Sequence, residues 1–275
     1  MILLHNLGTS KSLGRVMVAP HRAIVLASLL PACLAMGVRP PAVDSRMAST
    51  YDSLSQRLLA RLARLEEGEA WWVGIAGGPG AGKSTLAAAV CERINAAAGS
   101  EVSVVIPMDG FHYSRERLCE LDPPDASAYL PRRGAPWTFD AESLCNALTA
   151  AKAVGEAVLP TYSRVLSDPV SGGAELKRCH RLILVEGNYL LMLHDPRWAP
   201  LKTLWNETWF ISCASAAEQR KRLVARHLET WNDEKAKRWG EGEAGAAARA
   251  DANDVLNMQL IMPCKEHADV LIESL

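Results

Sequence analysis

The stretch Gly77-Gly78-Pro79-Gly80-Ala81-Gly82-Lys83-Ser84 matches the pattern G-x-x-x-x-G-K-[ST]. The residues before it, 71–76, predict a short buried strand, and Leu86, Val90 and Ile94 follow it at helical spacing. Glycines let backbone N–H groups converge on phosphate oxygens, and the N-terminus of the following helix adds a positive dipole. The sequence therefore predicts a phosphate-binding loop (P-loop) for ATP or GTP. Its residues are Gly77, Gly78, Pro79, Gly80, Ala81, Gly82, Lys83, Ser84 and Thr85.

The two polar residues that end the motif have separate expected roles. The Lys83 ammonium can reach the β- and γ-phosphates, and the Ser84 hydroxyl can ligate Mg²⁺. A glycine-rich turn with no ligand is the structural alternative. We expect ATP and Mg²⁺ as cofactors.

Strands and helices alternate outward from this loop. Besides 71–76, strands are predicted at 102–108, 181–185, 207–211 and 268–272, and helices at 51–66, 83–95 and 141–153. Ser215 and Glu218 form a capping-box pattern that begins another helix, which runs through Arg226. Residues 240–250, rich in Gly, Ala and Glu, indicate a mobile loop or a frayed helix. The alternation predicts the α/β class with a mainly parallel sheet, in a three-layer P-loop NTPase sandwich.

Composition restricts the functions that are possible. The chain has 275 residues, 49% of them hydrophobic, which is enough for one substantial core, and we expect a catalytic domain over 47–275. A net charge of −1 provides no general attraction for nucleic acid or an anionic membrane. The seven cysteines include no C-x-x-C pair, so we expect reduced thiols in a reducing compartment.

Residues 1–46 form a predicted extension with a different composition. They contain no acidic residue before Asp44, and an apolar run, 23–38, is interrupted by Pro31. This run is too short to predict a stable membrane span. Three alternatives remain: a targeting segment, a signal-like anchor, or a chain that really starts at Met47. A targeting segment predicts a plastid or mitochondrial protein, and a start at Met47 predicts a cytoplasmic one.

A second chemical signal follows the strand predicted at 102–108. Asp109 comes directly after Met108, at the carboxyl edge of the predicted sheet, where ligands of open α/β sheets bind. A carboxylate at this edge can accept the proton of an attacking hydroxyl. The alternative is a loop aspartate that caps a turn.

With these motifs in place, the chain resembles the phosphoribulokinase, uridine kinase and bacterial-type pantothenate kinase family of P-loop kinases over residues 71–272. The specific matches are Met108-Asp109-Gly110-Phe111-His112, similar to the family's D-G-F motif, and Leu184-Val185-Glu186-Gly187-Asn188-Tyr189-Leu190-Leu191, similar to its E-G strand. The resemblance implies that Asp109 is the catalytic base and that Glu186 lies near the metal and the acceptor. It also implies that His112 lies on the substrate side.

Three further stretches resemble the family's substrate side. They carry Arg133 before Gly134, Tyr162 and Arg164 in a Pro-x-Tyr-Ser-x stretch, and Asn253 before the last strand. Arg164 stands where the family pattern has His. Ordinary loop or cap chemistry is the alternative for each stretch. Two arginines on this side indicate an acceptor with a carboxylate, a phosphate or several hydroxyls. Pantothenate, a sugar or sugar acid, and a nucleoside all remain open.

The helix through Arg226 resembles the one that leads into the family's helical lid. The resemblance implies that Arg222 or Arg226 stabilises charge on the transferring phosphoryl group, and a solvated basic face is the alternative. We therefore predict an ATP-dependent kinase that phosphorylates a hydroxyl of a small metabolite, with no nucleic-acid partner. The rival is a P-loop ATPase with a regulatory or assembly role and no metabolite acceptor. The oligomeric state is open, with a homodimer as one candidate.

Overall fold

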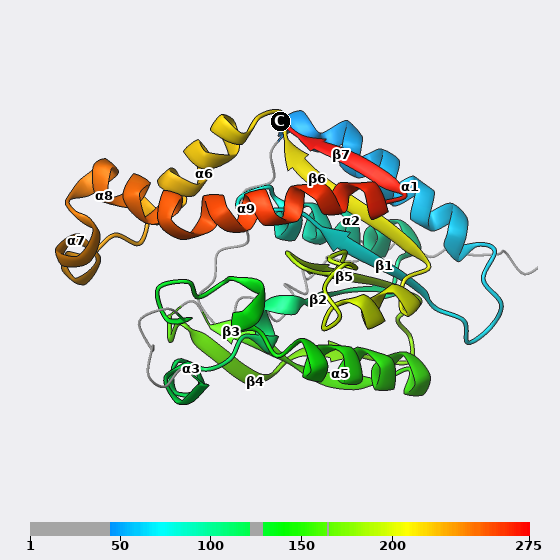
Figure 1. Cartoon of the computed structure of the whole chain (residues 1–275). Helices are drawn as coiled ribbons and strands as arrows, with labels where there is room; N and C mark the ends of the chain where they lie inside the picture. The colour runs from blue at the N-terminus through cyan, green and yellow to red at the C-terminus, as the bar shows by residue number, and fades with distance from the viewer. Residues whose placement is uncertain (1–44, 122–128, 164) are drawn as a thin grey trace, which may run out of the picture. The chain divides into compact units, whose positions relative to one another are not determined.

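Five parallel strands form the central sheet, in the order β2-β5-β1-β6-β7. The computed structural model, drawn in Figure 1, describes residues 45–121, 129–163 and 165–275. The chain divides into two units, Met1–Pro40 and Pro41–Leu275, and all described residues belong to the second. The strands of the sheet are β1 (Trp71–Ala76), β2 (Ser103–Pro107), β5 (Leu182–Gly187), β6 (Glu207–Cys213) and β7 (Val270–Ser274).

Successive side chains of these strands enter two different cores. Val73, Leu184 and Ile211 face the core covered by α1 (Ala48–Leu62) and α2 (Lys83–Ala98). Trp72, Val185 and Phe210 face the larger core, which is closed by helices and turns on the other side. These are α5 (Ala141–Val154), η5 (Ala199–Thr203) and α9 (Val255–Ile261). Because strands buried on both faces have apolar residues at nearly every position, their sequences are almost continuously hydrophobic.

Strand register brings the predicted motifs together at one edge. Glu186 of β5 pairs with Ile75 of β1 on one side and with Pro107 of β2 on the other. The P-loop follows β1, and Asp109 follows β2 within the turn η3 (Met108–Phe111). Since parallel strands end at the same edge, the P-loop, Glu186 and Asp109 converge there, in the position where open α/β sheets bind their ligands.

A hairpin separate from the sheet packs against η3. Its strands β3 (Ala157–Ser163) and β4 (Asp168–Leu176) pair antiparallel, with a register irregularity between Leu159 and Thr161. A Cβ at Gly110 would lie 2.0 Å from the Pro160 carbonyl oxygen, so only glycine permits this approach. The hairpin thereby brings β3 beside Asp109. The short elements α3 (Arg115–Leu121) and η4 (Pro136–Thr138) lie between η3 and α5 in the sequence.

Helices after β6 form the predicted lid, seen at one end of Figure 1. They are α6 (Ala216–Leu228), α7 (Asp233–Trp239) and α8 (Gly242–Arg249). A π-helical turn, η6 (Ala250–Asp254), joins α8 to α9, and η7 (Met262–His267) leads from α9 to β7. The lid has a small core of its own, formed by Leu223, Val224, Ala246 and Ala250. The turn η2 (Ser45–Met47) precedes α1.

Most of the predicted elements are present with shifted ends. The fold class is confirmed, and 71–76 matches β1 without a shift. The Ser215 hydroxyl accepts a hydrogen bond from the Glu218 N–H, as its capping role predicts. Residues 240–250 are mostly helical, in α8. The hairpin was not predicted, because β4 contains Pro169 and a Gly172-Gly173 pair that are unfavourable in strands.

Two predictions concern residues outside the described ranges. Residues 1–44 of the predicted extension, with the apolar run 23–38, lie outside them, and so does Arg164. Over the part of the chain that is described, no helix combines the length and apolarity needed to cross a bilayer.

Candidate active site

The P-loop lysine is buried and held by two acceptors. Its Nζ donates to the Gly78 carbonyl at 3.1 Å and to Asn188 Oδ1 at 2.6 Å. Burial lowers the pKa of Lys83, while Glu186 and Asp109 raise it and Arg226 lowers it. An ammonium buried in this way gains a great deal from a nearby anion, because its water shell has been removed. Lys83 is therefore arranged to receive a phosphate group.

Ser84 and Glu186 bring together two oxygen atoms that can bind a metal ion, beside Lys83. Ser84 Oγ donates to Glu186 Oε1 at 2.9 Å, and Glu186 is buried at the end of β5. Hydroxyl and carboxylate oxygens are ligands that Mg²⁺ prefers, and Mg²⁺ sites at phosphates use few protein ligands. The chemistry of these two residues fits the predicted metal role.

Asp109 is exposed at the edge of the sheet. Its carboxylate forms no hydrogen bond with any residue that the structure describes, so it caps no turn among them. It is close enough to raise the pKa of Lys83, His112 and Tyr162. An uncommitted carboxylate beside the phosphate lysine is what a general base requires, because it must remain free to take a proton.

Three residues predicted on the substrate side lie together. The His112 ring is 4.8 Å from the Tyr162 ring, and the Arg133 guanidinium lies 5.6 Å from the centre of the Tyr162 ring. Burial lowers the pKa of His112, which favours the neutral imidazole, and burial raises the pKa of Tyr162. His112 Nδ1 is 2.8 Å from the Asp109 carbonyl oxygen, and this contact orients the ring. The structure thus assembles an aromatic wall next to Asp109.

Arg133 is already engaged by the protein. Its guanidinium donates to Asp168 Oδ1 at 2.7 Å, to the Tyr113 carbonyl at 3.0 Å and to the Ser167 carbonyl. These partners lie at the start of β4 and after η3, so Arg133 ties the hairpin to the body of the domain. A direct contact with the acceptor would have to compete with this ion pair.

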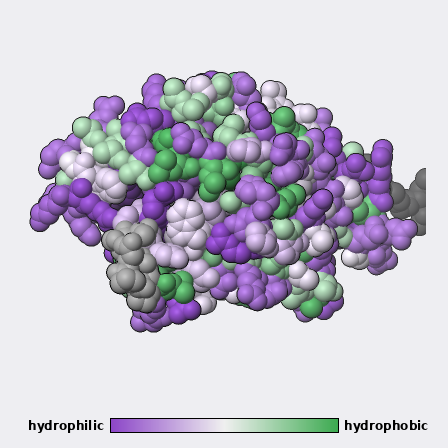
Figure 2. All heavy atoms as spheres, in the orientation of Figure 1, coloured by the Kyte–Doolittle hydropathy of each residue, from purple (hydrophilic) through white to green (hydrophobic). Residues whose placement is uncertain are grey.

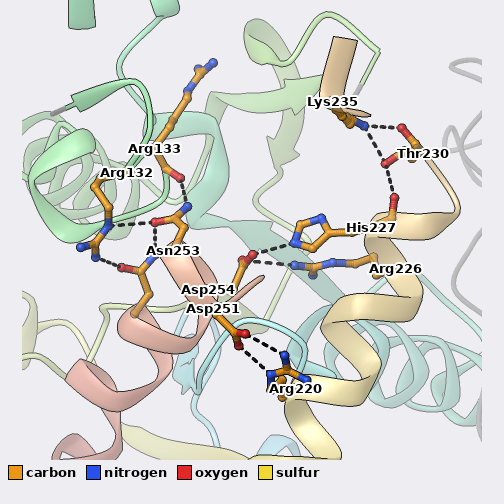
Figure 3. Close-up of polar contacts among 11 residues, drawn as sticks. Arg132, Arg133, Arg220, Arg226, His227, Thr230, Lys235, Asp251, Asn253 and Asp254 are labelled. Atoms are coloured by element: carbon orange, nitrogen blue, oxygen red, sulfur yellow. Dashed lines mark hydrogen bonds and ion pairs between the residues drawn. The ribbon is translucent and has the colours of Figure 1, made fainter. Parts of the chain in front are cut away.

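Asn253 is engaged as well, through the π-helical turn. Its Nδ2 donates to the Arg133 carbonyl at 2.7 Å, and its Oδ1 accepts from Arg132 and from Asn257, both at 3.2 Å (Figure 3). Figure 3 also shows the Arg133 side chain pointing away from Asn253. The structure therefore places Asn253 behind the loop that carries Arg133, as a support of that loop.

The two candidate lid arginines face different partners. Arg226 lies 3.7 Å from Asp254, which is also 2.7 Å from His227 Nε2 (Figure 3). Arg226 is also near enough to Lys83 to lower the pKa of that lysine. Arg222 instead donates to Ser274 Oγ at 2.7 Å, on β7. Of the two, Arg226 is the one directed toward the phosphate lysine.

Three residues of the site were not assigned from sequence. Asn188 holds Lys83, and its position after Glu186-Gly187 at the strand edge was an available signal. Gln219 of α6 is buried and donates to the Pro79 carbonyl at 2.8 Å, which joins the lid to the P-loop. Arg249 ends α8 near Arg226 and Tyr162. No local sequence pattern distinguishes Gln219 or Arg249, because their neighbours come from distant parts of the chain.

One family model matches part of the chain. It is described as methylmalonyl Co-A mutase-associated GTPase MeaB, and it matches residues 42–110. This segment contains β1, the P-loop, α2 and β2 and ends directly after Asp109. It includes neither the hairpin nor the lid.

Longer similarities extend over the hairpin and the lid. "Putative uridine kinase C227.14" of Schizosaccharomyces pombe is 33% identical over 235 residues, which cover 85% of this chain and 94% of that protein. A pantothenate kinase of Coxiella burnetii is 27% identical over 255 residues, covering 83% of this chain and 77% of the kinase.

A solved structure extends this similarity to three dimensions. It is described as a "putative fructose transport system kinase" from Silicibacter sp. TM1040. It is 32% identical with a TM-score of 0.67 and covers 81% of this chain and 98% of its own. Identity, coverage and fold therefore agree with the motifs at the sheet edge. The chain belongs to the phosphoribulokinase, uridine kinase and bacterial-type pantothenate kinase family of P-loop kinases.

Proposed function

We propose that this protein transfers the γ-phosphate of ATP to a hydroxyl group of a small metabolite, with Mg²⁺ as the metal. One observation carries the proposal: Asp109 has no hydrogen-bond partner among the described residues and stands beside buried Lys83 at the carboxyl edge of the sheet. A carboxylate there can accept the proton of an acceptor hydroxyl while Lys83 contacts the phosphate that moves.

The other residues of the site have complementary roles. Ser84 and Glu186 would hold Mg²⁺, which would supply positive charge to offset the charge of the phosphates. Asn188 holds the Lys83 ammonium at the loop, and Arg226 adds a second cation from the lid. Guanidinium groups suit this position because charge spreads over several phosphate oxygens during transfer.

The acceptor would lie between Asp109 and the wall formed by His112 and Tyr162. Relatives that are named as uridine and pantothenate kinases support a hydroxyl acceptor of metabolite size. The same two relatives differ in the chemistry of the acceptor that their names imply, so they do not select between a nucleoside and a hydroxy acid.

A P-loop ATPase with a regulatory or assembly role is the second candidate. The match of residues 42–110 to a GTPase family model favours it, because that segment holds the phosphate site. Hydrolysis without a metabolite acceptor would use the same P-loop. Hydrolysis of this kind would need neither the aromatic wall beside Asp109 nor the hairpin that supplies Tyr162 to the wall.

Acceptor-dependent ADP release separates the two candidates. The wild-type protein with MgATP would be incubated with single hydroxy compounds: nucleosides, sugars, hydroxy acids and sugar phosphates. A kinase should release ADP far faster with one class of compound, and the phosphorylated product should appear in equal amount. ADP release at one constant rate with every compound would support the ATPase and contradict the kinase.

A further inference from the structure

Two arginines of the lid, Arg238 and Arg249, form no hydrogen bond or ion pair with any described residue. Arg238 is exposed, whereas Arg249 is half buried at the end of α8. Arg220 pairs with Asp251 at 2.6 Å, and Arg226 pairs with Asp254 at 3.7 Å (Figure 3). A guanidinium that has lost part of its water shell gains from an anionic partner, and the described residues supply none to Arg249.

Other cations crowd Arg249. Burial lowers its pKa, Asp254 opposes that change, and Arg226 and Arg238 lower the pKa further. Arg249 in turn lowers the pKa of Lys235, together with burial. Figure 2 shows hydrophilic side chains gathered over α7, which carries Lys235 and Arg238. The cations that act on Arg249, or on which it acts, are therefore Arg226, Arg238 and Lys235.

The carboxylate that acts most strongly on Arg249 is already committed. Asp254 accepts a contact from His227 Nε2 at 2.7 Å and also pairs with Arg226 (Figure 3). One shared carboxylate cannot balance the charges of Arg226, Arg238 and Arg249. The three guanidinium groups repel one another, and an additional anion would reduce this repulsion.

The end of α8 also lies close to the acceptor side of the site, because Asn253 in the following turn donates to the Arg133 carbonyl at 2.7 Å. Tyr162 of β3 is among its electrostatic neighbours, and Tyr162 lies against the His112 ring and the Arg133 guanidinium. Arg226, the next cation, acts on Lys83 of the P-loop. Arg249 therefore stands where the lid meets the aromatic wall.

Arg133 is not available for the same role without a rearrangement. Its guanidinium is bound to Asp168 at 2.7 Å and to two backbone carbonyls. In the proposed function, the P-loop, Lys83 and Arg226 bind the phosphates of ATP. An anion on the acceptor thus remains as the group that Arg249 is placed to bind.

We propose that Arg249 binds an anionic group, a carboxylate or a phosphate, of the acceptor, so that the preferred acceptor is a hydroxy acid or a sugar phosphate. This inference rests on the proposed kinase function. Arg226 and Arg238 strengthen the attraction, and the acceptor's free hydroxyl is left to face Asp109. Because both anions accept two parallel N–H bonds from a guanidinium, the shared chemistry is bidentate recognition.

The test compares each anionic acceptor with its neutral counterpart. ADP release is measured with D-glycerate and glycerol, pantothenate and pantothenol, and ribose 5-phosphate and ribose, extended to other hydroxy acids and sugar phosphates. The first two pairs report on a carboxylate and the third on a phosphate. The proteins are wild type, Arg249→Gln, Arg249→Lys and the matched control Lys221→Gln. Lys221 is an exposed lid cation with no interaction among the described residues.

We expect wild type to favour the anionic member of at least one pair. Arg249→Gln should raise the KM for that anion about 10–100-fold, the usual effect of losing a hydrogen bond between charged groups. The KM for ATP should change much less, Arg249→Lys should recover part of the loss, and Lys221→Gln should resemble wild type. Melting temperatures of all four proteins check that they are folded.

Four results would overturn the inference. Turnover of neutral acceptors alone, or an equal loss for anionic and neutral acceptors in Arg249→Gln, would contradict anion binding and leave the kinase function standing. A raised KM for ATP with an unchanged KM for the acceptor would place Arg249 on the nucleotide instead. Absence of acceptor dependence with every compound would overturn the inference and the kinase function together.

Discussion

Two regions of the site are held in different ways. The sheet edge with Lys83 and Glu186, called the floor below, is fixed by strand pairing, whereas the lid is held by contacts between side chains. Glu186 pairs with Ile75 and Pro107 in adjacent parallel strands, and buried Lys83 is held beside it by Gly78 and Asn188. In the lid, the exposed Arg220–Asp251 pair and the longer Arg226–Asp254 pair connect α6 to η6. Exposed ion pairs contribute only about 0–1 kcal/mol each, so they can open without unfolding the domain.

The floor and the lid should therefore differ in rigidity. A register shift in the sheet would move every side chain to the other face, so the groups on the floor have a single arrangement. Because the lid has only a small core of its own, we expect it to move more easily than the sheet edge, which would let substrates enter and water leave. Substitutions in the floor and in the lid should therefore differ in their effects, and those in the floor should be the larger.

The largest effect is expected for Lys83→Ala. Acceptor phosphorylation should fall to background, because the variant removes the buried ammonium that we propose as the phosphate ligand, while the domain stays folded. Turnover and melting temperature would be measured beside Lys202→Ala, an exposed lysine in η5. Near-normal turnover in a folded Lys83→Ala would show that the P-loop is not where the chemistry occurs.

Asp109→Asn should lower turnover about 10²–10⁴-fold while nucleotide affinity changes much less. The amide keeps the size of the side chain but cannot take a proton. A role as a metal ligand predicts partial rescue by higher Mg²⁺ or by Mn²⁺, and a structural role predicts a lower melting temperature at unchanged turnover.

Asp52→Asn is the matched control for this charge loss, since Asp52 pairs with Arg93 on the surface away from the sheet edge. Unchanged acceptor phosphorylation by a folded Asp109→Asn would exclude Asp109 as the base and would leave the nucleotide site intact.

For the lid, Asp254→Asn should lower turnover about ten- to a hundredfold, since Arg226 would lose its anchor and misplaced groups cost rate steeply. The free energy of unfolding should fall by about 1–3 kcal/mol, because the contact with His227 is partly buried. The control is Asp251→Asn in the same π-helical turn, whose exposed pair with Arg220 should matter little. Equal effects of the two substitutions would mean that Asp254 has no special part in placing Arg226.

The smallest effect is expected at the N-terminus. A chain that starts at Met47 keeps buried Met47 and the whole of α1, so its turnover and melting temperature should match those of the full chain. A chain that starts at Gln56 loses Met47, Tyr51 and Leu54 from the core and should melt at a clearly lower temperature. If the chain that starts at Met47 fails to fold, residues 1–46 belong to the domain, and both the targeting and the Met47-start interpretations are wrong.

Local sequence patterns were sufficient to predict the strands of the sheet and most of the residues at its carboxyl edge. The P-loop glycines, the apolar runs of β1, β2 and β5, and the residues that end those strands are all short-range features. Since parallel strands end at one edge, those runs are enough to predict that Asp109 lies beside the P-loop with Lys83. Glu186 was added by the family resemblance.

Tertiary structure alone decided how the substrate side and the lid are used. Arg133 is tied to Asp168, Asn253 supports the Arg133 loop, and Arg249 is left without a partner among the described residues beside Tyr162. Each of these facts depends on side chains that are distant in sequence, and β3 and β4 pair despite Pro and Gly residues that local propensity disfavours. Sequence periodicity reports which face of an element is buried, but the partner of a polar side chain is set by packing between elements.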